Sequence, residues 1–273
     1  MLTQAHLSGC VERRLKVDTC RSMCQQSNNG DKTSNESSNE SSEEREYAVK
    51  QRILKSSLPF VSQYGWTQNA LSAGAETEGL PGIAHGLFPK GGIELVFYFY
   101  NDCNKRLAEE LAEQVKQETE EQTDGQKTGP KIRPFIRNAV ETRLRMITPY
   151  IEKWPQAMGM MAIPVNAPEA LNNLLNLTDE IWYHAGDKST DFNWYTKRLS
   201  LAGVYKSTEI FMVQDKSDDY EDTWYFLDRR MEDLNSIGNI ARSSKETGAI
   251  LTETCKGMMI MARNVLGANS RAK

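Results

Sequence analysis

Residues 179–199, DEIWYHAGDKSTDFNWYTKRL, bring together aromatic and charged side chains that could recognise a ligand. The aromatic residues lie on both sides of a Gly-Asp turn, and they are Trp182, Tyr183, Phe192, Trp194 and Tyr195. On a helix after the turn, Trp194 and Arg198 share one stripe with Leu201 and Tyr205. A guanidinium within an aromatic stripe needs an anionic partner, and a phosphate group meets that need. The alternative is an ordinary aromatic core without a ligand.

Patterns typical of enzymes are weak in this chain. Glu180 and His184 are four residues apart, whereas a di-iron carboxylate bundle needs two Glu-x-x-His pairs on facing helices. A Ser-His-Asp or Cys-His constellation stays open, but no nucleophile elbow or glycine-rich phosphate loop supports one. We interpret His184 as a packing or surface residue. We therefore expect no catalytic residue, metal or cofactor.

Composition and charge narrow the class of protein. The 273 residues are 39% hydrophobic and 26% charged, with a formal net charge of −4. The apolar deficit is local, because no residue of the set AVILMFWYC occurs from Gln25 to Glu46. The remaining body is nearly neutral, which does not favour nucleic-acid binding. The five cysteines are scattered and do not indicate a disulfide framework, and no stretch approaches the roughly 20 apolar residues of a membrane span.

The order of segments along the chain predicts an all-α fold behind a polar N-terminal region. We expect residues 1–46 to be disordered, since so polar a tract has little surface to bury. The basic first 24 residues are either a targeting segment or a solvated tail. Apolar spacing of the helical type begins at Tyr47. The predicted helices or helical stretches are 47–64, 67–75, 81–88, 92–121, 135–147, 149–161, 168–185, 191–214, 219–235 and 240–266. We group them as helix-turn-helix-like helices in 47–105, a helical body in 106–235 and an amphipathic helix with its tail in 240–273.

The first three predicted helices resemble the N-terminal helix-turn-helix of tetracycline-repressor-like (TetR) regulators. The resemblance rests on the pair Gly65-Trp66 and on the phrase AHGLFPK at 84–90. The expected recognition helix, 79–88, contains no Arg, Lys, Asn or Gln with which to contact base edges. We therefore expect these helices to be structural and not to bind DNA.

Two phrases, TDEIWYHAGDKSTDFNWYTKR and DYEDTWYFLDRRMED, carry a closer resemblance. They resemble the C-terminal signature of the lipid-binding, TetR-like accessory proteins of mitochondrial ubiquinone biosynthesis, the ninth of the numbered coenzyme Q set. The resemblance implies a non-catalytic homodimer at the matrix face of the inner membrane. Such a protein binds isoprenoid quinone intermediates and phospholipid, and it presents substrate to demethoxyubiquinone hydroxylase. The alternative function is that of a TetR-like, ligand-responsive transcription regulator.

The same resemblance assigns site residues by position. Arg198, Trp194 and Tyr195 are expected to bind lipid. Asp191, Trp194, Tyr195 and Ile181 are expected to bind the partner enzyme. Lipid and partner would thus share two aromatic side chains.

The last predicted helix indicates a membrane contact without help from the resemblance. Its segment GMMIMA, residues 257–262, is apolar on all sides, which is more than a solvent-facing helix needs. It is too short to span a bilayer but suits the interface. We expect Met258, Met259, Met261 and Val265 to contact lipid. The alternative is that this helix docks on the body or on a second subunit.

Overall fold

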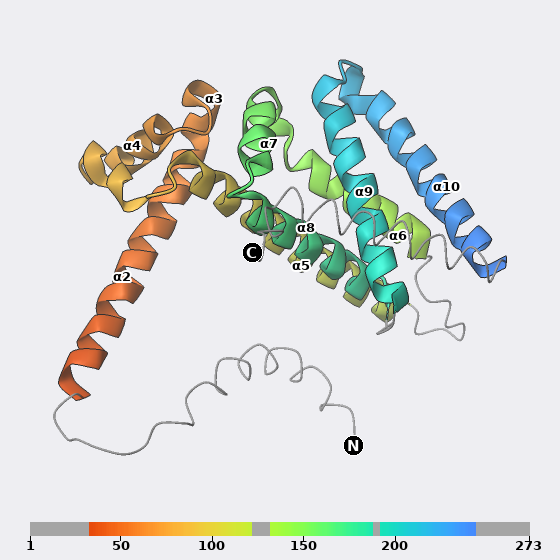
Figure 1. The fold of residues 1–273 in the computed structure, drawn as a ribbon, viewed down its shortest axis with the longest axis horizontal. Coiled ribbons are helices and arrows are strands. Elements are labelled where there is room, and N and C mark those ends of the chain that lie inside the picture. Colours follow the sequence, from red (N-terminus) through yellow and green to blue (C-terminus); the bar gives the residue numbers. More distant parts are fainter. Residues whose placement is uncertain (1–32, 122–131, 188–191, 244–273) are drawn as a thin grey trace, which may run out of the picture. The chain divides into compact units, whose positions relative to one another are not determined.

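The computed structural model describes residues 33–121, 132–187 and 192–243, and these residues form helices and no strand (Figure 1). The all-α prediction is confirmed. The chain divides into two units, residues 1–50 and 51–273. The α-helices are α2 (Thr33–Ser57), α3 (Val61–Tyr64), α4 (Gln68–Thr77), α5 (Gly92–Glu121), α6 (Ile132–Arg145), α7 (Trp154–Ala162), α8 (Ala167–His184), α9 (Phe192–Gln214) and α10 (Glu221–Ser243). Short 3₁₀ turns connect some of them: η1 (Leu58–Phe60), η2 (Gly82–Leu87), η3 (Thr148–Lys153) and η4 (Asp218–Tyr220).

Helix α2 begins earlier than expected. We predicted disorder up to residue 46, but the chain is already helical from Thr33. Residues 33–46 contain no Gly or Pro, and a helix that has begun extends through such residues at little cost. Glu46 and Lys50 add an ion pair of 2.7 Å at the favourable i, i+4 spacing. The apolar pattern located the buried part of the helix and missed its polar extension.

The helices after α2 follow the predicted order but differ in type. Gly65, with a φ of +67°, ends α3 where the sequence predicted a stop, and Thr67 precedes α4 as expected. The segment expected to be a recognition helix is instead the 3₁₀ helix η2, since Pro81, Gly82 and Gly86 disfavour a longer α-helix. Whether this region is TetR-like stays a prediction.

An aromatic cluster joins these short helices to the bundle. The ring centroids of Trp66, Phe99, Tyr150 and Trp154 lie 5.1–5.8 Å apart in all five contacts among them, mostly edge to face. The backbone N–H of Trp66 also donates to Oε1 of Gln156 at 3.0 Å. The Gly65-Trp66 pair therefore ends one helix and anchors the next to the core.

Helix α5 is the longest described helix and organises the bundle. Its bounds, Gly92–Glu121, match the prediction, and the ambiguous LVFYFY segment is helical. It packs against α6 and α8, while α9 packs against α8 and α10, and α10 also packs against α6 (Figure 1). Because α5 runs through the boundary expected at 105–106, the helices on either side of it form one unit. Helix α10 likewise continues to Ser243, past the separate helix expected to start at residue 240.

Candidate functional site

The residues singled out from the sequence lie at the corner between α8 and α9. Helix α8 ends at His184, and Gly186 takes a φ of +84°, which an L side chain would disfavour. The N–H of Gly186 donates to the carbonyl of Tyr183 and that of Asp187 to the carbonyl of Trp182, so the end of α8 is capped by its own turn. This cap fixes Asp187 at the base of the corner.

Arg198 is the centre of the corner. It is 4% exposed, and its Nε donates to Oδ1 of Asp179 at 2.5 Å while Nη1 donates to Oδ2 of Asp187 at 3.1 Å. Lys197 Nζ reaches the other oxygen of Asp187 at 2.7 Å and lies 5.2 Å from the Trp182 ring centroid. Two acids and two bases from α8, the turn and α9 therefore form one compact network.

This network changes the argument for Arg198, whose expected contact with lipid stays a prediction. The sequence argument was right that a buried guanidinium needs an anion, but the chain itself supplies two carboxylates. Arg198 therefore does not require a lipid phosphate as its counter-ion. Leu201 and Tyr205, on the same stripe, are fully buried. From Arg198 onward this stripe is the core-facing side of α9, which corresponds to the alternative interpretation of the sequence.

The neighbouring stripe of α9 faces outward. Tyr195 is 61% exposed and Leu199, four residues later, is 49% exposed. Residues at this spacing are neighbours on a helix surface, so the two make one apolar patch. Ile181, which we expected on the partner-binding surface, is fully buried in the core instead. In this arrangement the Ile181 side chain packs on the inner face of α8 and is not accessible to a partner.

Several predicted site residues lie outside the described part of the chain. They are Asp191, the side chain of Trp194, and Met258, Met259, Met261 and Val265. Within the described ranges, no helix is long and apolar enough to cross a membrane.

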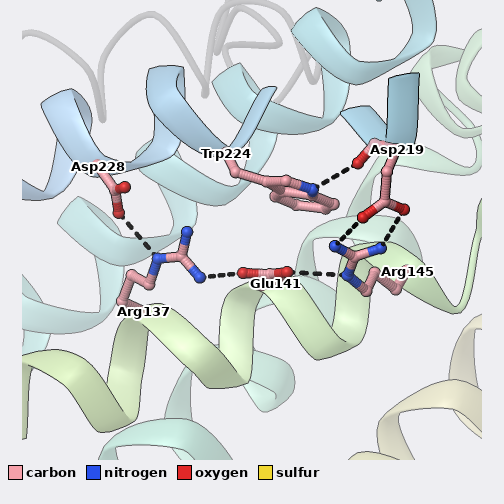
Figure 2. A network of polar contacts seen from close by, with 6 residues as sticks. All are labelled: Arg137, Glu141, Arg145, Asp219, Trp224 and Asp228. Carbon is pink, nitrogen blue, oxygen red and sulfur yellow. Dashed lines mark hydrogen bonds and ion pairs between the residues drawn. The ribbon is translucent and has the colours of Figure 1, made fainter. Parts of the chain in front are cut away.

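A second polar network, between α6 and α10, was not assigned from the sequence (Figure 2). Arg145 donates through both terminal nitrogens to the carboxylate of Asp219, at 2.8 and 3.0 Å, and through Nε to Glu141. Its guanidinium lies 4.6 Å from the ring centroid of Trp224, whose indole N–H donates to the backbone carbonyl of Asp219. Arg137 extends the network from Glu141 to Asp228.

The second network explains part of the DYEDTWYFLDRRMED phrase. Asp219 and Tyr220 have positive φ values of 51° and 60°, which is uncommon for residues other than glycine. The Arg145 hydrogen bonds lower the pKa of Asp219, and the same contacts stabilise its charged form. The i, i+4 spacing of Arg137, Glu141 and Arg145 was visible in the sequence, but their partners on α10 were not. This network joins α6 to η4 and α10.

A histidine at the end of α8 lies beside an acid on the same helix. His184 Nε2 lies 3.9 Å from Glu180 Oε2, and burial lowers the pKa of this histidine. The residues that the structure describes contain no group of three or more His, Cys, Asp or Glu able to hold a metal ion.

The fold and this corner define an all-α bundle protein that exposes apolar side chains above a buried ion-pair network. The chain belongs to the ubiquinone biosynthesis protein COQ9 family. Residues 167–238 match the family described as COQ9, and residues 46–76 match the one described as the N-terminal domain of ubiquinone biosynthesis protein COQ9.

Three relatives illustrate the similarity. The mitochondrial ubiquinone biosynthesis protein COQ9 of Rattus norvegicus is 42% identical over 228 residues, which cover 84% of this chain and 72% of the relative. The protein of the same name from Homo sapiens is also 42% identical, over 84% of this chain and 70% of its own. That from Drosophila melanogaster is 38% identical over 220 residues, 81% of this chain and 65% of its own.

Proposed function

We propose that this chain is a non-catalytic, lipid-binding protein of ubiquinone biosynthesis. In this proposal it binds isoprenoid quinone intermediates and phospholipid at the matrix face of the inner mitochondrial membrane. It then presents the substrate to demethoxyubiquinone hydroxylase, acting as a homodimer. Membership of the family supports the pathway, and the mitochondrial relatives support the mitochondrial location. The TetR-like regulator is the alternative function.

The exposed patch of Tyr195 and Leu199 is the observation that carries the partner-binding part. These side chains lie directly beside Arg198, whose two ion pairs hold α9 against α8. An apolar patch on such a fixed support keeps its shape before binding, and this lowers the ordering cost of association. We assign partner and lipid contacts to Trp194 and Tyr195, and a partner contact to Asp191.

Arg198 is assigned to positioning in this proposal. A lipid phosphate would have to displace Asp179 or Asp187 to reach its guanidinium. Of the two, Asp179 is the exposed one, with 48% of its side chain accessible against 6% for Asp187. Displacement of Asp179 is therefore the route by which Arg198 would contact phospholipid.

A pull-down of demethoxyubiquinone hydroxylase tests the patch. Tyr195→Lys is expected to weaken binding by a factor of about 30 or more, since truncated interface anchors typically cost about 2 kcal/mol. Tyr225→Lys is the matched control, because Tyr225 is 67% exposed on α10, away from the α8–α9 corner. Mass spectrometry of lipids extracted from the purified chain tests the lipid-binding part in parallel. Equal binding by both variants would refute the role of the patch in binding the hydroxylase. The absence of isoprenoid lipid would refute the lipid-binding part of the proposal.

A further inference from the structure

A second group of polar side chains is sealed inside the bundle, away from the α8–α9 corner. Tyr100 on α5, Arg143 on α6 and Tyr205 on α9 are each no more than 1% exposed. Nη1 of Arg143 has no hydrogen-bond partner, and the two tyrosine hydroxyls interact with each other but with no other hydrogen-bonding group of the described residues. Buried donors are almost always paired, and leaving one unpaired costs free energy. A hydrogen bond between the two hydroxyls uses one of their protons, so the other hydroxyl proton and Nη1 of Arg143 remain without an acceptor.

The three groups are close neighbours. The Arg143 guanidinium lies 4.6 Å from the centroid of the Tyr100 ring. Burial is the largest influence on the pKa of each of the three groups, and beyond it each group affects the other two. Burial raises the pKa of both tyrosines, so their hydroxyls stay protonated and act as donors at neutral pH.

The charge of Arg143 is not neutralised by a contacting carboxylate. Its Nε donates to the amide oxygen of Asn104 at 2.9 Å and its Nη2 to the backbone carbonyl of Tyr100 at 3.3 Å, and both acceptors are neutral. Among the described residues, no carboxylate lies within ion-pair distance of this guanidinium.

The nearby buried acid, Glu209, is already used. It is 1% exposed and accepts from Trp154 Nε1 at 3.1 Å and from Lys206 Nζ at 2.7 Å. Lys206 Nζ lies 5.7 and 5.9 Å from the ring centroids of Tyr100 and Tyr205. The cluster therefore holds two cations and one anion, and one positive charge is left over in the interior. A buried charge of this kind is costly without a counter-ion.

We propose that Tyr100, Arg143 and Tyr205 form a binding site for one negatively charged acceptor atom. Hydroxyl and guanidinium donors around one excess positive charge suit a halide ion or the anionic oxygen of a carboxylate or phenolate. The site goes beyond the proposed function, since presentation at the α8–α9 corner uses none of these residues. If the anion site is refuted, the expected binding to the hydroxylase is unchanged. The two proposals are therefore tested separately.

Thermal unfolding of the full chain, stripped of lipid, tests the halide form of the site. Sodium chloride or bromide at saturation is expected to raise the melting temperature by roughly 5 °C over sodium gluconate at equal ionic strength. The double variant Tyr100→Phe with Tyr205→Phe is expected to lose most of this shift. Tyr64→Phe, which changes a partly exposed tyrosine, is expected to keep it. In crystals soaked in bromide, an anomalous peak is expected at the Arg143 guanidinium.

Mass spectrometry of the chain before lipid removal tests the organic form. A copurifying carboxylic acid or phenol is expected to be retained by wild type and by Tyr64→Phe, and lost from the double variant. Halide-dependent stability and a retained acid each support the site and identify the source of the anion.

Without a bound anion, the double variant is expected to be as stable as wild type or more so, because it removes both members of a buried hydroxyl pair at once. If the double variant is as stable as wild type in every salt and wild type retains no acid, the site is refuted. An equal halide shift in wild type and double variant also refutes it.

Discussion

Arg198 and Asp187 depend on each other for burial. Arg198 has only 5% of its side chain exposed and Asp187 only 6%, and the two form an ion pair of 3.1 Å. Removing one partner of a buried pair leaves the other charged and desolvated, which costs more than the pair itself contributes. The geometry of the α8–α9 corner therefore depends on the ion pair between Arg198 and Asp187.

Arg198→Met is expected to lower the free energy of unfolding by roughly 3–5 kcal/mol. Arg198→Lys is expected to lose less, because an ammonium keeps the charge but cannot bridge two carboxylates as the planar guanidinium does. Chemical denaturation measures both changes, alongside the phospholipid that copurifies. Loss of phospholipid from Arg198→Lys without loss of stability would instead assign Arg198 to a lipid headgroup.

Asp215 caps the start of α10 and makes stability depend on pH. Burial works to raise its pKa, but hydrogen bonds from Thr223 and Ser217 outweigh burial and lower the pKa below its ordinary value of 3.8. A depressed folded-state pKa adds stability above the unfolded value, and this stability is lost as the pH falls through the folded value. Asp215→Asn is expected to cost about 1 kcal/mol at pH 7. The difference from wild type should shrink below pH 3.8 in denaturant titrations, and a constant difference would contradict the assignment.

At the scale of elements, the close approach of α2 and α4 depends on one glycine. A Cβ at Gly74 would lie 2.1 Å from Ser57 Oγ and 2.7 Å from the Ser57 backbone nitrogen, whereas one at Gly159 in α7 would meet nothing within 4 Å. Gly74 is thus required by packing, and Gly159 is not.

Alanine at these two positions is expected to have opposite effects. Gly74→Ala should destabilise the chain by roughly 1–3 kcal/mol through overpacking. Gly159→Ala should stabilise it by roughly 0.5–1 kcal/mol, because alanine is the better helix former. Thermal melts of both variants give the comparison. A stabilised Gly74→Ala would mean that α2 and α4 separate without cost.

The short helix η2 determines what the helix-turn-helix-like region can do. It is a 3₁₀ helix without Arg, Lys, Asn or Gln, and the Nδ1 of its only histidine, His85, lies 3.1 Å from Ser72 Oγ and 2.9 Å from the carbonyl of Gly82. We expect no sequence-selective binding of duplex DNA at physiological salt. Gel shifts with genomic fragments over a range of salt concentrations test this. Submicromolar, selective binding would favour the transcription-regulator alternative.

Across the whole molecule, the sequence predicted helix positions better than partners between helices. The periodic apolar positions placed α5, α8 and α9 within two residues of their observed bounds, because burial of one face imposes that pattern. The same pattern could not show that Arg198 meets Asp179 and Asp187, since pairing depends on how helices cross. It also could not show that Glu209 is paired with Lys206 while Arg143 is not. Charged residues in a core were recognisable as unusual, but their contacts are properties of the assembled bundle.

The proposed membrane contact depends on residues 257–262, beyond the described helices, and we expect it to separate from folding. Met258→Glu with Met261→Glu places two charges on a surface proposed to enter the lipid interface, where each buried apolar side chain contributes roughly 1.5–3 kcal/mol. Flotation with liposomes should therefore weaken strongly, whereas the melting temperature should barely change. Lys256→Glu, on the side that the sequence pattern predicts to be polar, controls for the added negative charge. A double variant that melts much lower and still floats would show that these methionines pack against protein, on the body or on a second subunit.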